Sequence, residues 1–367
     1  MKERGLRSPW DPSLAMLGVS TPTRDKGGPS MERQYVGIDL HRRTSTIHRM
    51  DADGEVLGCV RILSQPHELT QAMADAGDNP EVVLESTYGW YWAADLLQEL
   101  GANVHLAHPL GNSWGNRRVK NDERDAKDLA AMLRLGRLAE GWIAPPETRE
   151  LRELVRYRFR LVGYRTSTKA QIHGVMAKNG ILPVRKEMWG PGGDAQLDAL
   201  ELPGAYAIRL ESLRYLLDIF DAEVEILDRY IHSRLRDDPG YSTIMGIDGV
   251  GKVLGAIFVA EIGDIGRFSS AKKLCSWAGL TPKHRESDDK VWRGPITHQG
   301  SPLVRWAAIE AISKYRGGDK LRADYHRIAE RAGKFKARVA VARKLLTLVY
   351  YGLRDKEIRS LEDPEAA

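Results

Sequence analysis

A fixed order of strand and helix patterns between residues 35 and 134 limits the folds that are open to this chain. The segments "YVGIDL" (35–40), "TSTIHRM" (44–50) and "EVLGCVRI" (55–62) have the short apolar or alternating character of strands joined by polar turns. They are followed by a helix pattern ("QPHELTQAMADAG"), a strand ("EVVLE"), a helix ("YGWYWAADLLQEL"), a strand ("NVHLA") and a third helix that opens in "KNDERDAKDLA". The sequence therefore predicts a three-strand meander that continues into alternating helices and strands.

This order, with Asp39 in the middle of the first strand, is that of an RNase H-like domain, so the predicted fold class is α/β followed by mainly α. Strand patterns nearly vanish after Pro145 and Pro146, where a long helix pattern begins. Residues 1–30 mix Pro, Gly, Ser and charges without periodicity. The predicted parts are a disordered tail (1–30), the RNase H-like domain (31–145), long helices (146–240), a mainly helical domain (241–356) and a second disordered tail (357–367).

The predicted middle part carries an apolar stripe at three- and four-residue steps, which is typical of a long amphipathic helix. Its members are Leu213, Leu216, Leu217, Ile219, Phe220, Val224 and Leu227. Pairing of long helices would bury this stripe, and a dimerising coiled coil is one form that such pairing takes.

Bulk composition narrows the class of protein further. The 367 residues are 42% hydrophobic, but no apolar run approaches the roughly 18 residues that a membrane span needs. Cys59 and Cys275 are the only cysteines, which excludes a disulfide framework and a four-thiolate zinc site. We expect both to be core thiols of a cytoplasmic protein.

The net charge is +5, with acids gathered early in the chain and Lys and Arg crowded later, and this distribution favours polyanionic partners.

Four carboxylates occupy positions that suit a metal site. Asp122 and Asp125 lie three apart at a helix start and therefore share a face. Asp39 projects from the first strand, and Glu85 ends the strand expected beside it. Such a set could bind two Mg²⁺ ions, or Mn²⁺, for phosphodiester chemistry. Alternatively, Asp122 is a helix N-cap, Asp125 and Asp128 are surface acids, and Glu85 simply ends a strand. Asp128 could also replace Asp122 as the partner of Asp125.

Two further patterns suggest contacts with a phosphate backbone. Arg149, Arg152 and Arg156 recur at helical spacing, but an exposed face of ion pairs with Glu147, Glu150 and Glu153 fits them equally well. The segment "IMGIDGVGKVLGAIF" resembles a helix-hairpin-helix, in which Gly249, Gly251 and Lys252 would hold a phosphate. A purely structural turn explains these glycines almost as well.

Taken in order, six motifs resemble the transposases of the insertion sequence 110 family over residues 34–356. They are "YVGIDLH", "VVLESTYGWY", "KNDERDAKDLA", "GIDGVGKVLGAIFVAEIGDIGRF", "LCSWAGLTPKHRES" and "RGPITHQGSPLVRWAAIEA". The resemblance implies a RuvC-like domain whose four acids are Asp39, Glu85, Asp122 and Asp125, which favours Asp122 over Asp128. It also implies a transposase domain with a serine nucleophile, matched here by Ser287.

Around Ser287, four cations could neutralise the attacked phosphate: Lys283, Arg285, Lys290 and Arg293. The chain departs from the family here, because Asp288 and Asp289 stand where glycine is frequent. Ser301 and Ser276 are the alternative nucleophiles, although Ser301 before Pro302 also fits a helix N-cap.

The resemblance further implies an enzyme that excises and inserts its own element by cutting and rejoining DNA through a phosphoserine intermediate. It implies two partners, DNA and a structured non-coding guide RNA from the element. Because the acids and the serine lie far apart in the sequence, we also expect them to meet between copies of the chain in a dimer or tetramer. The site of action would be the bacterial nucleoid. The alternatives are a RuvC-like nuclease that only hydrolyses DNA and a non-catalytic nucleic-acid binder. The sequence leaves His41, His284 and His298 open between acid-base helpers and ordinary polar residues.

Overall fold

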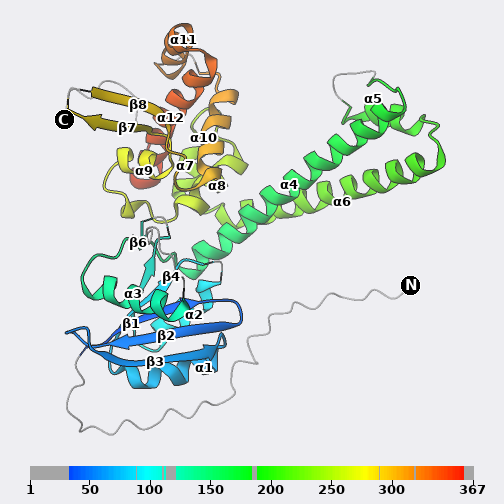
Figure 1. Ribbon diagram of the computed structural model, residues 1–367. Helices are drawn as coiled ribbons and strands as arrows, with labels where there is room; N and C mark the ends of the chain where they lie inside the picture. The colour runs from blue at the N-terminus through cyan, green and yellow to red at the C-terminus, as the bar shows by residue number, and fades with distance from the viewer. Residues whose placement is uncertain are drawn as a thin grey trace. The chain divides into compact units, whose positions relative to one another are not determined.

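The structure is a computed structural model that describes residues 33–87, 89–109, 111–112, 121–183, 188–288, 290–317 and 320–358. Its contacts divide the chain into two compact units, Met1–Ile143 and Ala144–Ala367. The first unit holds a mixed sheet with helices, and the second is mostly helical (Figure 1). The predicted tail over 1–30, and residues 359–367 of the second predicted tail, lie outside the described residues.

The first unit is built on a six-stranded sheet in the order β3-β2-β1-β4-β5-β6. Its strands are β1 (Tyr35–Leu40), β2 (Thr44–Met50), β3 (Val56–Leu63), β4 (Glu81–Glu85), β5 (Asn103–Ala107) and β6 (Glu140–Gly141). Its helices are α1 (Pro66–Met73) with the 3₁₀ turn η2 (Ala74–Ala76), α2 (Trp90–Glu99) and α3 (Asp122–Arg134). The first three strands are antiparallel, whereas β4 runs parallel to β1 and β5 parallel to β4. The predicted element order is confirmed, with β6 as an unpredicted addition, and it is consistent with an RNase H-like domain.

The two faces of β1 serve different purposes. Val36, Ile38 and Leu40 belong to the apolar core that the sheet forms with α1 and α2. The intervening residues Gly37 and Asp39 point the other way because side chains alternate along a strand. That other face is covered by α3, whose backbone lies directly against Gly37.

No side chain fits between β1 and α3 at Gly37. A Cβ atom at this position would collide with the backbone oxygen of Ala126 and would lie 2.7 Å from the backbone nitrogen of Ala130. Glycine is therefore required by the close approach of two backbones. Since Gly37 and Asp39 share a face, this approach also sets the distance between Asp39 and the start of α3.

We expect Gly37→Ala to lower the free energy of unfolding of the first unit by about 2 to 3 kcal/mol, because the added methyl must push helix from strand. Amide hydrogen exchange of β1 and β4, resolved by mass spectrometry, measures this in the full chain. Gly163→Ala is the matched control, since no atom lies within 4 Å of its added Cβ and α4 gains a better helix former. Equal exchange protection of β1 in the two variants would contradict the role of Gly37.

The second unit contains two long helices, α4 (Pro146–Lys178) and α6 (Gly204–Leu235), which pack side by side with α5 (Pro191–Asp198) at their far end (Figure 1). Its other elements are α7 (Pro239–Met245), α8 (Lys252–Ile262), η3 (Ile265–Arg267), α9 (Ala271–Trp277), β7 (Pro282–Ser287), β8 (Lys290–Ile296), α10 (Pro302–Lys314), α11 (Lys320–Ala332) and α12 (Lys334–Asp355). The largest core of this unit gathers α7, α8, α9, α10 and α12.

The predicted stripe on α6 is divided between two environments. Leu213, Leu217 and Val224 are buried, whereas Leu216 and Ile219 are each 38% exposed. Helix pairing is thus confirmed, with α4 of the same chain as the partner of α6. A coiled coil between two copies stays a prediction.

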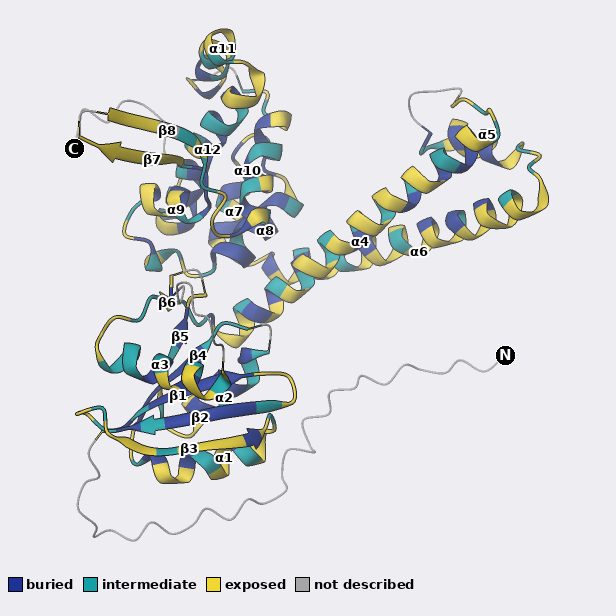
Figure 2. Cartoon of the chain, in the orientation of Figure 1, coloured by how far each residue is buried: buried dark blue, intermediate teal, exposed yellow. Residues whose placement is uncertain are grey.

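Two features of the structure differ from the predictions. The ribbon β7-β8 lies in a region predicted to be mainly helical, and most of it is exposed (Figure 2). Because neither of its faces is buried, it lacks the apolar alternation that identifies strands. Cys59 is exposed rather than a core thiol, because β3 is an edge strand with most of its side chains exposed, whereas Cys275 is buried as predicted. Among the described helices, none has the length and apolarity of a membrane span.

Candidate active site

The acidic residues of the first unit approach one another where the parallel strands end. Ile38 of β1 pairs with Leu84 of β4, so Asp39 and Glu85 stand at the next position of the same register. Asp122 is the first residue of α3, and Asp125 follows it by three residues, on the same helix face. Asn121, whose side chain accepts a hydrogen bond from the Glu123 amide at 3.1 Å, is the N-cap, so the alternative role of Asp122 as the cap is wrong.

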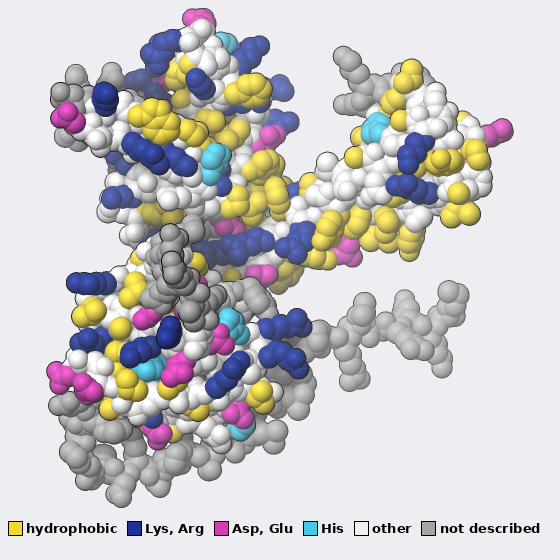
Figure 3. All heavy atoms as spheres, in the orientation of Figure 1, with side chains coloured by type: hydrophobic (Ala, Val, Ile, Leu, Met, Phe, Trp, Pro, Cys, Tyr) yellow, Lys and Arg dark blue, Asp and Glu magenta, His cyan; other side chains and the backbone are white. Residues whose placement is uncertain are grey.

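His41 joins two of these acids. Its Nε2 atom lies 3.1 Å from Oδ2 of Asp39 and 3.6 Å from Oδ1 of Asp122. One ligand atom from each of the three residues lies within 4.8 Å of the other two, which is a spacing that could hold a metal ion. On the outer side, Nη2 of Arg61 lies 3.6 Å from Oδ2 of Asp122. In Figure 3 this part of the first unit shows acidic and His side chains beside Lys and Arg.

Asp39 is the most buried of the four acids. Burial raises the pKa of its carboxyl group, His41 opposes this, and the negative charges of Asp122, Asp125 and Glu85 raise the pKa further. Its side chain is only 4% exposed, and Oδ2 accepts no hydrogen bond from the residues that the structure describes. A buried carboxylate oxygen among three further carboxylates fits a divalent cation, since oxygen donors are the ligands that Mg²⁺ and Mn²⁺ prefer.

The surroundings of Asp39 also distinguish the acids of α3. Asp122 and Asp125 both act on its carboxyl group, and Asp128 is absent from the charges that shift its pKa. The charge of Glu123 instead acts to raise the pKa values of His48 and Cys59. Asp122 and Asp125 are therefore the acids of α3 whose charges act on Asp39.

Ser287 lies in the second unit, at the last position of β7, opposite Lys290 of β8. The turn between them holds Asp288 with φ at 54°, a left-handed conformation that glycine adopts at lower cost. This accounts for the glycine that is frequent here in the family that the chain resembles. Ser287, Lys283, Arg285 and Lys290 are all exposed. The side chain of Arg293, the fourth predicted cation, lies outside the described part of the chain.

Ser301, one alternative nucleophile, has a structural role. It is buried, caps α10 by accepting a hydrogen bond from the Val304 amide at 3.3 Å, and donates to Oε2 of Glu261 at 2.9 Å. Its N-cap role is confirmed. Ser276, the other alternative, is exposed on α9.

We expect Ser301→Ala to lower the free energy of unfolding of the helical unit by about 2 kcal/mol, because it removes a cap and a hydrogen bond to a buried carboxylate. Thermal unfolding followed by circular dichroism measures the loss. Ser270→Ala, which removes only the half-buried N-cap of α9, is the control and is expected to cost about half as much. If the Ser301 variant were as stable as wild type, the bond to Glu261 would contribute nothing.

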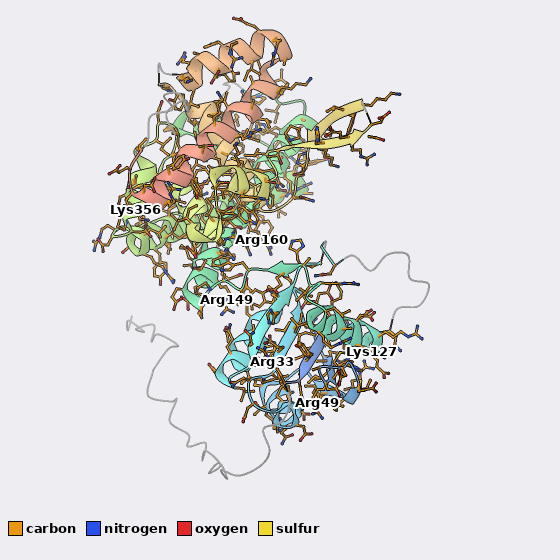
Figure 4. The ribbon with its side chains drawn as sticks, turned by 90° about the vertical axis from the view of Figure 1, so that its left-hand side faces the viewer. Arg33, Arg49, Lys127, Arg149, Arg160 and Lys356 are labelled. Carbon is orange, nitrogen blue, oxygen red and sulfur yellow. The ribbon has the colours of Figure 1, made fainter. Side chains whose placement is uncertain are left out.

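Phosphate binding by Arg149, Arg152 and Arg156 stays a prediction, and the structure gives these arginines contacts within the protein. Arg149, labelled near the start of α4 in Figure 4, is only 4% exposed. Arg152 donates to the backbone oxygens of Ala260 and Glu261 at 2.8 and 3.0 Å.

Arg156 forms a bidentate ion pair with the buried Glu261 carboxylate at 2.7 and 3.1 Å. The contacts of Arg152 serve α8, because the last carbonyls of that helix need donors and Arg152 of α4 supplies them. The alternative, exposed ion pairs with Glu147, Glu150 and Glu153 of α4 itself, stays a prediction.

The glycine-rich loop before α8 serves packing at one position. Gly249 has φ at 81°, and a Cβ there would collide with the backbone oxygen of Ala311 in α10. The structural interpretation therefore applies to Gly249. Gly251 has no atom within 4 Å of an added Cβ, and Lys252 is exposed, so these two remain open to solvent.

Comparisons with known proteins agree with the resemblance. A family model described as "Transposase IS116/IS110/IS902 family" matches residues 241–326, and a DEDD model named for IS110 and described as "Transposase" matches residues 36–179. The chain is 27% identical to y4qE of Sinorhizobium fredii, which is named as a transposase, over 82% of this chain and 77% of that protein. It is 22% identical to the transposase for insertion sequence element IS1111A of Coxiella burnetii, over 88% and 90% of the two chains. The pilin gene-inverting protein of Moraxella bovis is 33% identical over 31% of this chain and 36% of its own length.

Proposed function

Because this chain belongs to the IS116/IS110/IS902 family of transposases, we propose that it cuts and rejoins DNA strands with a divalent-metal centre and a serine nucleophile. The observation that carries the metal centre is Asp39, a buried carboxylate whose Oδ2 accepts no hydrogen bond within the described residues and whose pKa is raised by burial and by three other acids. The ligands that we propose are Asp39, Glu85, Asp122 and Asp125.

Each acid has a distinct part in this proposal. Asp39 and Asp122, whose oxygens both approach His41, would hold one Mg²⁺ or Mn²⁺ ion, and Glu85 and Asp125 would complete a site for a second. Bound there, a divalent cation supplies stabilisation of the charge that develops on the attacked phosphodiester. Arg61, at the outer side of Asp122, would hold the DNA backbone against the site.

Ser287 is the nucleophile that we propose for strand exchange. Its Oγ forms a bond to phosphorus while the bond from phosphorus to one strand end breaks, and its hydroxyl proton passes to water or to the departing oxygen. Attack by a hydroxyl of another strand end reverses these steps, restores the serine and joins the strands. The exposed Lys283, Arg285 and Lys290 would neutralise the phosphate.

Guide RNA and further copies of the chain are the proposed partners. Lys and Arg side chains gather over the helices at the C-terminal end of the second unit, which suits a nucleic-acid backbone (Figure 3).

A separate exposed apolar row follows α6 at seven- and four-residue steps and suits a second copy of the chain. Its members are Ile208, Tyr215, Ile219, Ile226 and Tyr230.

Incubation of the full chain with DNA of its element, the transcribed RNA of the element's flanks and MgCl₂ tests the proposed function. Denaturing gel electrophoresis is expected to show a labelled DNA strand that is covalently joined to protein. Cleavage without this adduct would instead indicate a nuclease that hydrolyses DNA with water as the nucleophile. Binding without cleavage would indicate a non-catalytic nucleic-acid binder.

A further inference from the structure

His41 has no part in the reaction described so far, although its Nε2 atom lies near both Asp39 and Asp122. It follows β1 directly, and its backbone oxygen accepts a hydrogen bond from Oγ of Ser64 at 2.8 Å. Ser64 is fixed in turn, because its hydroxyl bonds that of Ser45 at 2.7 Å and its amide donates to the Arg43 oxygen at 3.0 Å. The imidazole is therefore presented from an anchored backbone, as a preorganised ligand should be.

The distances around His41 match those within a coordination sphere. Two neighbouring ligands of an octahedral ion, each about 2.1 Å from the metal, lie about 3 Å apart. Nε2 of His41 lies 3.1 Å from the Asp39 oxygen and 3.6 Å from the Asp122 oxygen. The Asp39 oxygen in question is buried and accepts no hydrogen bond from the described residues, so its close neighbour is the His41 nitrogen with which it can form an ion pair.

We propose that His41 is a nitrogen ligand of the metal centre, and that this centre consequently favours Mn²⁺, or a similar transition ion, over Mg²⁺. The inference rests on the proposed metal centre and specifies its chemistry. Mg²⁺ is a hard cation that takes oxygen ligands and keeps its waters, whereas imidazole binds transition ions well. Replacing one oxygen donor by an imidazole therefore shifts the preference of the site.

A simple counter-ion role for His41 makes a different prediction. As a counter-ion, His41 would neutralise Asp39 and Asp122 only in the absence of metal and would leave when a cation binds. As a ligand, it stays within bonding distance of the ion. A measurement on the bound ion therefore separates the two roles.

The experiment uses the full chain with MnCl₂ as the probe. Electron spin echo envelope modulation of bound Mn²⁺ is expected to show coupling to an imidazole ¹⁴N in wild type and to lose it in His41→Ala. By titration calorimetry, His41→Ala should weaken Mn²⁺ binding about tenfold while changing Mg²⁺ binding by less than about twofold. His41→Asp restores an oxygen ligand and should bind Mg²⁺ more tightly than His41→Ala without recovering the ¹⁴N signal.

His67→Ala is the matched control, since His67 is exposed on α1 near Glu68 and is not one of the residues grouped around Asp39. It should keep the ¹⁴N signal and both affinities. If Mn²⁺ binds to wild type without ¹⁴N coupling, or if the coupling survives in His41→Ala, the ligand role is overturned and the carboxylate centre stands. If wild type and Asp39→Asn bind Mn²⁺ equally, the metal centre itself is overturned, and His41 with it.

Discussion

The Asp39→Asn variant is expected to cleave DNA at least about 10³-fold more slowly than wild type, while its fold remains as stable as that of wild type or becomes more so. Asparagine has nearly the shape of aspartate but lacks the charge that would bind a cation. Strand cleavage on a denaturing gel measures the first expectation, and chemical unfolding in the presence of EDTA measures the second.

The stability part of this prediction follows from the raised pKa of Asp39. An acid whose pKa is higher in the folded than in the unfolded state makes folding less favourable as pH rises from the unfolded value of about 3.9 to the raised one. Above that window the metal-free wild type carries the full cost of a buried charge beside three other acids. Asp39→Asn removes this cost, so its stability should lack that step with pH.

Asp128→Asn is the control for Asp39→Asn, because it removes an acid of α3 that is not among the charges acting on Asp39. We expect its cleavage rate to stay within about threefold of wild type. Cleavage by Asp39→Asn at the wild-type rate would remove the basis for the metal centre. A loss in Asp128→Asn as large as in Asp39→Asn would move the pair on α3 to Asp125 and Asp128.

The Ser287→Ala variant is expected to form no covalent protein-DNA adduct, a loss of at least about 10³-fold, while still binding Mn²⁺ with wild-type affinity. Alanine removes the attacking oxygen and leaves the ribbon otherwise unchanged, because Ser287 is exposed and its backbone pairing with Lys290 does not need the hydroxyl. Labelled DNA that migrates with denatured protein measures the adduct.

Ser276→Ala is the control for the nucleophile, since Ser276 is also an exposed serine of the second unit. It should form the adduct at the wild-type level. An adduct that persists in Ser287→Ala and disappears in Ser276→Ala would assign the nucleophile to α9. Cleavage by Ser287→Ala without any adduct, at the wild-type rate, would favour hydrolysis by water.

The elements of the first unit were predictable because burial on one face imposes a regular pattern. The strands β1, β2 and β4 are almost entirely buried, and α3 carries buried residues at helical spacing. The ribbon β7-β8 lacked this signal, because alternation of polar and apolar residues arises only where one face meets a core. A single sequence therefore reports burial patterns more reliably than it reports strands.

The sequence predicted candidate residues for the site, but it did not predict which side chains contact one another. The order of elements placed Asp39 in the first strand and Glu85 at the end of the neighbouring strand, and helical spacing put Asp122 and Asp125 on one face. The contact of His41 depends on where β1 ends and on a hydrogen bond from Ser64, and neither leaves a pattern in the sequence. Helical spacing also identified the face of α4 that carries the arginines. It did not predict that α8, which lies about one hundred residues later in the chain, packs against this face.

The close approach of α3 to Gly37 has a consequence for how copies of a mobile element decay in a genome. Every missense change in the codon for Gly37 adds a side chain where the backbone oxygen of Ala126 already lies. A single nucleotide change there could disable a copy whose acids and serine all remain in place. A census that counts copies as functional by those residues alone would therefore overestimate the number able to move.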